Sequence, residues 1–318
     1  MNAPTTFPIL TLRGRSDGPH VLIVAGVHGD EFEPISAVRR LAGALEGEVG
    51  AGRLTLVPVA NLSAFRLGAR VGEDGLDLAR TCPGRADGSI TERVAQELSR
   101  LIQSSDALID LHNGGLRLSV TPLAGYMLHP DFEILNTQRR MARAFGPPIV
   151  WGTDPGLEGR TLSVARDAGV PAIYVEYLGG GAFNPIARDA LTAGCRSVLA
   201  DLGITDEAPP PLGSPPLIIE DDRPNSGFMQ VQHPCPRDGF FEPRARLGQH
   251  VAEGEPLGVL DDPTGQSSLV IRAERSGIVL ASRVFPSVLA GESLGVVAAL
   301  RTRQGVADVV PFRDRSPR

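Results

Sequence analysis

A histidine and a glutamate lie three residues apart near the start of the chain, directly after an apolar run. His28 and Glu31 follow residues 21–27, which have the composition of a strand buried on both faces. A helical pattern begins at the glutamate, so both side chains lie in a strand-to-helix turn and can reach one point. We interpret them as candidate metal ligands. By itself, this spacing equally fits a histidine that ends a strand beside a glutamate at a helix start.

The same arrangement occurs twice more in the sequence. The apolar run 107–111 leads into His112, and the run 171–175 leads into Glu176, and both side chains are followed closely by glycines. The carboxyl ends of parallel strands meet at one edge of a sheet, where open α/β sheets bind their ligands. The pattern therefore predicts a single site formed by His28, Glu31, His112 and Glu176.

Composition and charge limit the class of protein. The chain has 318 residues, of which 42% are hydrophobic and 21% charged, and its net charge is −6. This balance indicates no basic surface for nucleic acid and no polybasic membrane anchor. Three separated cysteines form neither a disulfide framework nor a Cys-x-x-Cys metal site. No signal peptide or membrane-length apolar run is evident, so we expect a soluble cytoplasmic protein.

Helical patterns alternate with the apolar runs through the first two thirds of the chain. This alternation predicts an α/β fold with a mainly parallel sheet and flanking helices. Tyr126 and Tyr174 are expected to be packing residues. The expected helices span residues 31–45, 91–104, 131–145, 159–169 and 185–202.

A proline-rich stretch, 208–216, is predicted to be a linker between a catalytic domain (1–207) and a small β domain (217–318). Sequence stretches such as Gly239-Phe-Phe-Glu-Pro resemble those of the barrel-sandwich folds of lipoyl and biotinyl carrier domains. The chain has no lysine between 238 and 300, which excludes a carrier arm. The extended segments expected in this domain are 227–231, 238–242, 257–260, 268–273, 277–284 and 294–299.

Five motifs occur in an order that resembles a known family. The set is similar to the succinylglutamate desuccinylase/aspartoacylase family, the deacylase branch of the zinc carboxypeptidase superfamily. The resemblance covers about residues 20–300, and within the family the chain looks like the N-acetyl-diaminobutyrate deacetylases of ectoine breakdown. The motifs lie at residues 26–31, 61–70, 77–84, 110–114 and 175–176.

The resemblance implies one zinc per chain, held by His28, Glu31 and His112. Two histidines and one carboxylate with an open fourth position is a catalytic rather than structural zinc pattern. Zinc would lower the pKa of a bound water toward ~7 and polarise the substrate carbonyl. Glu176 matches the general base and acid, and Arg70 matches the arginine that stabilises the oxyanion.

The resemblance also implies substrate contacts. Arg80 matches the arginine that holds a substrate carboxylate, a role that suits the guanidinium group. Asn113 is a further candidate substrate contact, although it and its neighbouring glycines can equally serve to let the backbone approach the metal. Asp110 is a candidate to orient His112. The family pattern at 77–80 is usually Asp-Leu-Asn-Arg, and the third residue here is Ala79, which weakens the case for an acyl-aspartate-like substrate.

The sequence thus predicts a zinc-dependent amidohydrolase that removes a small acyl group from an N-acyl amino acid or N-acyl amine, cleaving a C–N bond in a linear amide. The expected partner is a small molecule, and the sequence leaves a homo-oligomer open. Two alternatives remain: a carboxypeptidase-like enzyme that trims peptides, and a relative that binds metal or ligand without catalysis.

Overall fold

The computed structural model describes residues 7–207 and 214–299, so most of the expected linker lies outside the described residues. The chain divides into two compact units. The first contains the described residues of Met1–Leu116 together with Pro122–Gly227. The second contains Arg117–Thr121 and the described residues from Phe228 onward. None of the described helices is long and apolar enough to cross a membrane.

A largely parallel sheet organises the first unit, in the order β1-β3-β2-β4-β7-β5-β6-β8. β2 runs parallel to both β3 and β4, and β4 runs parallel to β7, so their carboxyl ends share one edge. β8 comes from a segment that we expected in the second domain and pairs with β6. The strands are β1 (Leu10–Arg13), β2 (Ser16–Val24), β3 (Ala51–Val57), β4 (Ala107–His112), β5 (Leu118–Met127), β6 (Ile149–Thr153), β7 (Ala172–Gly179) and β8 (Leu217–Glu220).

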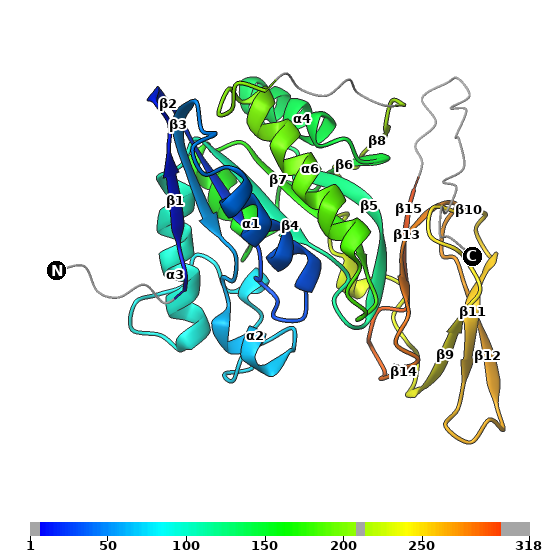
Figure 1. Ribbon diagram of the computed structural model, residues 1–318. Helices are drawn as coiled ribbons and strands as arrows, with labels where there is room; N and C mark the ends of the chain where they lie inside the picture. The colour runs from blue at the N-terminus through cyan, green and yellow to red at the C-terminus, as the bar shows by residue number, and fades with distance from the viewer. Residues whose placement is uncertain (1–6, 208–213, 300–318) are drawn as a thin grey trace. The chain divides into compact units, whose positions relative to one another are not determined.

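Helices cover both faces of this sheet (Figure 1). α1 (Phe32–Ala44), α4 (Phe132–Phe145) and α6 (Pro185–Asp201) pack on one face, where their apolar residues form the main core with alternate residues of β2, β4 and β7. α3 (Ile90–Gln103) and α5 (Thr161–Ala168) pack against each other, and α5 also contacts β7. Two short helices, α2 (Leu62–Leu67) and η1 (Leu78–Arg80), lie in the loop between β3 and α3. The expected α/β class is therefore confirmed.

Local sequence explains where these helices begin. Ser89 and Glu92 form a reciprocal capping box at the start of α3. Asn184 caps α6 through the backbone N–H groups of Ile186 and Ala187, and Pro185 occupies the first turn, where no N–H is needed. Glu31 is at the N-cap of α1 but makes no capping bond, because its carboxylate is used elsewhere.

The second unit is built from β-strands. β9 (Gly239–Pro243), β11 (Pro256–Asp261), β12 (Ser268–Arg272) and β14 (Ser287–Val288) form a four-stranded sheet in the order β12-β11-β9-β14. β13 (Gly277–Arg283) pairs with β10 (His250–Val251), with β15 (Gly295–Ala298) and with residues 118–120. The extended segment expected at 227–231 is wrong, because Met229–Val231 forms a short 3₁₀ helix, η2.

Candidate functional site

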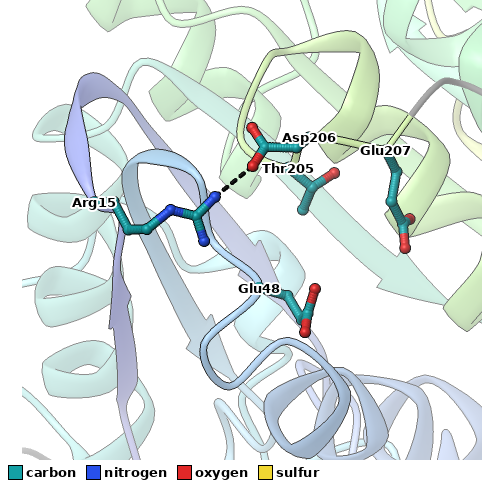
Figure 2. Close-up of a pocket in the computed structure, with 5 residues that line it drawn as sticks. All are labelled: Arg15, Glu48, Thr205, Asp206 and Glu207. Carbon is teal, nitrogen blue, oxygen red and sulfur yellow. Dashed lines mark hydrogen bonds and ion pairs between the residues drawn. The ribbon is translucent and has the colours of Figure 1, made fainter.

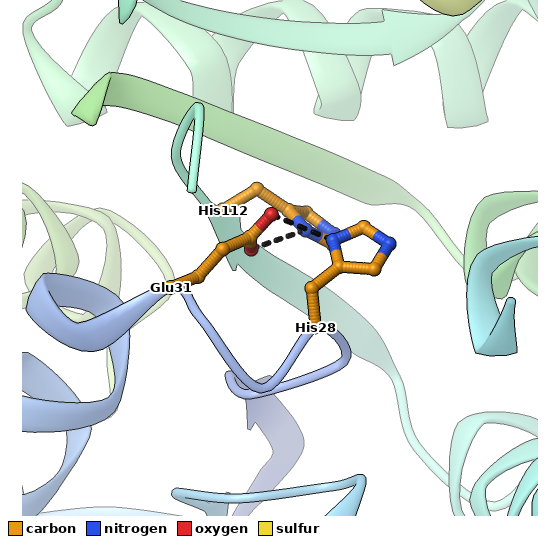
Figure 3. A group of neighbouring side chains, drawn as sticks. All are labelled: His28, Glu31 and His112. Carbon is orange, nitrogen blue, oxygen red and sulfur yellow. Dashed lines mark hydrogen bonds and ion pairs between the residues drawn. The ribbon is translucent and has the colours of Figure 1, made fainter. Parts of the chain in front are cut away.

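His28, Glu31 and His112 form a buried cluster at the carboxyl edge of the sheet (Figure 3). The Nδ1 atom of His28 lies 2.6 Å from Glu31 Oε1, and the Nδ1 atom of His112 lies 3.0 Å from Glu31 Oε2. The two imidazole ring centres are 5.2 Å apart. One candidate ligand atom from each residue lies within 4.8 Å of the other two. The turn after β2 and the end of β4 therefore bring together the three residues that the sequence singled out.

Each histidine also has a carboxylate near its other ring nitrogen. Asp77 Oδ1 lies 3.2 Å from Nε2 of His28, and Asp110 Oδ2 lies 3.2 Å from Nε2 of His112. The hydroxyl of Thr161, at the start of α5, donates to Asp110 at 2.5 Å. Carboxylates in this position fix the tautomer and the orientation of metal-ligating histidines. Both Nδ1 atoms are thereby directed toward the cluster.

The electrostatics of the cluster also suit a cation. Burial opposes ionisation of Glu31, yet the neighbouring His28 and His112 hold the pKa of this carboxyl well below its usual range. Burial likewise opposes protonation of His112, but Asp110 and Glu31 raise its pKa well above the usual value. Without a metal ion, the cluster holds protons that a bound metal ion would displace. Two imidazole nitrogens and one carboxylate could hold a divalent transition metal.

Glu176 lies beside the cluster on the next strand. It pairs with His112 across β4 and β7, and its side chain is buried. Its Oε2 atom is buried and makes no hydrogen bond to any residue that the structure describes. Burial raises the pKa of Glu176 to about 8, with a further contribution from the negative charge of Glu31. A carboxyl whose pKa is near neutrality is suited to exchange protons with a substrate.

Three arginines, Arg70, Arg80 and Arg160, lie near Asp77. Arg70 donates to Asp77 Oδ2 from Nε at 3.1 Å and from Nη2 at 2.9 Å, and its Nη1 lies 3.5 Å from His28 Nδ1. Burial and the neighbouring charge of Arg160 lower the pKa of Arg80 to about 10. Burial opposes ionisation of Asp77, but the hydrogen bond from His28 and the charge of Arg70 hold its pKa far below the usual range. At a pKa of about 10, the guanidinium group of Arg80 stays charged at neutral pH.

Asn113 lies close to the cluster, but its amide is engaged within the protein. Its Nδ2 donates to Glu33 Oε2 at 2.6 Å, and its Oδ1 accepts from the Gly115 backbone at 2.8 Å. The other oxygen of Glu33 accepts from the Asn184 backbone N–H at 2.6 Å. The side chain of Asn113 therefore connects neighbouring loops through these hydrogen bonds. The contact of Asn113 with substrate stays a prediction.

The sequence did not assign a role to three residues of this site. Asp77 belongs to a recognised motif, but its contact with His28 depends on how the loop before η1 folds. Arg160 occupies the N-cap of α5 and carries no sequence signal. Tyr174, which was expected to pack, lies two residues before Glu176 on β7 and shares its face, because successive side chains alternate across a strand.

A pocket of about 200 Å³ is lined by residues outside the His28–Glu31–His112 cluster: Arg15, Glu48, Thr205, Asp206 and Glu207 (Figure 2). Arg15 is paired with Asp206, as the figure shows, and Arg196 is paired with Glu207. These ion pairs account for most of its charge, so we assign no ligand to this pocket.

Comparison with known proteins places the chain in a family. Residues 17–202 match the model of the succinylglutamate desuccinylase/aspartoacylase catalytic domain. An N-alpha-acetyl-L-2,4-diaminobutyric acid deacetylase from Halomonas elongata is 32% identical over 294 residues, which cover 91% of this chain and 84% of the relative.

Solved structures show the same fold. The product-bound ectoine utilization protein EutE (DoeB) from Ruegeria pomeroyi is 28% identical, with a TM-score of 0.82, and a succinylglutamate desuccinylase from a Silicibacter species is 27% identical, with the same TM-score. Each match covers 92% of this chain and 88% of the other. Since the family model covers more than half of the chain and includes the whole His–Glu–His cluster, the protein belongs to the succinylglutamate desuccinylase/aspartoacylase family.

Proposed function

We propose that the protein is a zinc-dependent deacylase that hydrolyses the amide bond of a small N-acyl amino acid. The observation that carries this proposal is the buried His28–Glu31–His112 cluster, with Glu176 beside it on the neighbouring strand. Since the relative from Halomonas acts on N-alpha-acetyl-L-2,4-diaminobutyric acid, we propose an N-acetylated diamino acid as the first substrate to test.

In this proposal His28, Glu31 and His112 would hold the metal. Bound zinc would supply a Lewis acid and lower the pKa of a water molecule into the neutral range. Asp77 and Asp110 keep the two imidazole rings in the orientation that binding needs.

Glu176 carries the proton transfers. Its unsatisfied Oε2 is placed to accept a proton from the attacking water and then to deliver it to the leaving nitrogen. The raised pKa favours the second step, because the protonated acid remains populated near neutral pH. Arg70, held by Asp77 next to His28, donates hydrogen bonds to the oxygen that becomes negative as the carbonyl is attacked. Arg80 attracts the carboxylate of the substrate.

For the second unit, we propose that its paired strands form the barrel-sandwich-like domain that the sequence suggested.

The test combines metal content with turnover. Purified wild type should contain about one zinc per chain and release acetate from N-acetyl-2,4-diaminobutyrate. Glu176→Gln should keep its zinc and lose about 100-fold or more in kcat, the usual contribution of a positioned acid and base. Retained turnover in this variant would refute the role of Glu176. Cleavage of peptides but not of N-acyl amino acids would favour a carboxypeptidase, and zinc binding without any turnover would favour a non-catalytic relative.

A further inference from the structure

Tyr174 is the next polar side chain behind Glu176 on the same face of β7. In the register of β4 and β7, Glu176 lies opposite His112 and Tyr174 lies opposite Asp110. The intervening residue, Val175, faces the other side and belongs to the main core. Tyr174 is therefore placed one layer beneath the catalytic residues and on their side of the sheet.

The position of the Tyr174 ring depends on a glycine in the neighbouring strand. A Cβ atom added to Gly125 in β5 would lie 2.2 Å from Cε1 and from Cζ of the ring, and 2.5 Å from the hydroxyl oxygen. Contacts that short do not occur, so the ring lies directly against the backbone at a place that only glycine leaves open. The close fit fixes where the hydroxyl group lies.

Tyr174 is partly exposed, and its hydroxyl has no hydrogen-bonding partner among the residues that the structure describes. Tyr126, on β5, is different, because its hydroxyl donates to Glu220 at 2.7 Å. Burial and the negative charge of Glu176 raise the pKa of Tyr174, so that its phenol stays protonated and can donate at neutral pH.

The charges around the hydroxyl indicate what it would bind. The guanidinium of Arg160 is close enough to act on the ionisation of both Tyr174 and Arg80. Two partly buried arginines near a hydroxyl donor without a partner among the described residues favour an anionic acceptor. The adjacent motif carries Ala79, which offers no side-chain hydrogen bond of its own.

We propose that Tyr174 is a specificity-determining residue whose hydroxyl donates a hydrogen bond to a carboxylate of the substrate, alongside Arg160. This inference rests on the proposed function, since it concerns the substrate of the same site. The carboxylate can belong to the amino acid or to a dicarboxylic acyl group. The shared chemistry is a planar anion that accepts from a phenol and a guanidinium together.

The experiment uses conservative variants of the full chain. Tyr174→Phe removes the hydroxyl and keeps the ring, and we expect it to raise KM for N-acetyl-2,4-diaminobutyrate about 10-fold or more with little change in kcat. The matched control is Tyr177→Phe, which removes a hydroxyl from the same strand on the opposite face, where Tyr177 packs on the main core. This control should behave as wild type. Gly125→Ala, which displaces the ring, should reproduce the defect of Tyr174→Phe.

Substrate analogues identify the carboxylate. On the amide analogue N-acetyl-2,4-diaminobutyramide, which lacks the carboxylate, Tyr174→Phe and wild type should have equal KM. If only an N-succinyl amine, with its carboxylate on the acyl group, distinguishes the two proteins, then the hydroxyl binds the acyl side. An unchanged KM on every carboxylate substrate, or an equal defect on the amide analogue, would overturn the proposal.

Binding of the product separates this inference from the proposed function. Calorimetric titration of 2,4-diaminobutyrate into the zinc-loaded proteins needs no turnover, and Tyr174→Phe should bind about 10-fold more weakly than wild type. An inactive wild type with this difference would refute the deacylase and leave the carboxylate contact standing. An active wild type, with no difference from Tyr174→Phe in product binding or KM, would support the deacylase and refute the carboxylate contact.

Discussion

Replacement of Asp77 by asparagine should weaken metal binding although Asp77 is not a ligand. Its carboxylate lies 3.2 Å from Nε2 of His28, accepts two bonds from Arg70, and accepts the Ala79 backbone N–H at 3.0 Å. An asparagine has one acceptor oxygen and no charge, so it cannot satisfy all of these donors. The imidazole of His28 loses its fixed orientation, and Arg70 loses its fork-shaped contact.

The size of the effect follows from the contacts that are lost. Partners behind a metal-ligating histidine typically contribute 10- to 100-fold in metal affinity or activity, which corresponds to about 1.4–2.7 kcal/mol. The Arg70 contact adds less to stability than a buried pair would, because its side chain is 37% exposed and solvent screens it. We therefore expect Asp77→Asn to raise the Kd for zinc about 10- to 100-fold, with a small change in Tm.

The assay is competition for zinc against a chromophoric chelator, followed by kcat at full zinc occupancy. Asp74→Asn is the matched control, because Asp74 lies in the same loop but caps α3 through Ser89 and Thr91. It should lower Tm and leave the zinc affinity unchanged. Wild-type zinc affinity in Asp77→Asn would show that His28 is oriented without this carboxylate, and the reasoning would fail.

Two further predictions concern the backbone at the site and the second unit. Gly29→Ala should abolish zinc binding or folding, since its Cβ would lie 2.0 Å from the Ala64 backbone. Gly43→Ala, whose Cβ would enter open space beside α1, should instead raise the free energy of unfolding by up to about 1 kcal/mol. Equal Tm values for the two variants would contradict both expectations. Burial lowers the pKa of His233, whose Nδ1 donates to the Gly295 carbonyl and whose Nε2 accepts from the Glu274 backbone. The unfolded chain therefore takes up this proton first as the pH falls below about 6.5, and stability present above that pH is lost. Thermal unfolding at pH 7.5 and 5.5 should show a smaller loss of Tm in His233→Asn than in wild type, whereas a variant of the exposed His250 should show the wild-type loss.

The sequence predicted those parts of the fold that depend on local patterns. The runs before His28, His112 and Glu176 are short and apolar, and each forms a parallel strand that delivers its polar residue to the same edge. β5 was not predicted, because Pro122 and Gly125 interrupt its pattern and because its place in the sheet is decided by distant strands.

The parts of the site that the sequence could not predict depend on long-range contacts. Tyr174 has the pattern of a core residue, and its position follows from Gly125, which is 49 positions earlier in the chain. Asp77 and His28 are similarly distant in sequence, with a separation of 49 positions. Periodicity gives the face on which a strand residue lies, but only the folded chain shows which loop lies against that face.

The carboxylate of Glu33 has a consequence for how the proposed metal site would take up its ion. Through Asn113 and the Asn184 backbone it cross-links three loops: the start of α1, the segment after β4 and the segment before α6. The conformational freedom of these loops is therefore lost when the chain folds, and not when an ion arrives. We expect the metal-free protein to be a folded, stable receptor that can release and regain its ion without unfolding. A newly made chain in a metal-poor cell would then stay folded and able to bind the ion, and its activity would rise and fall reversibly with the supply of metal.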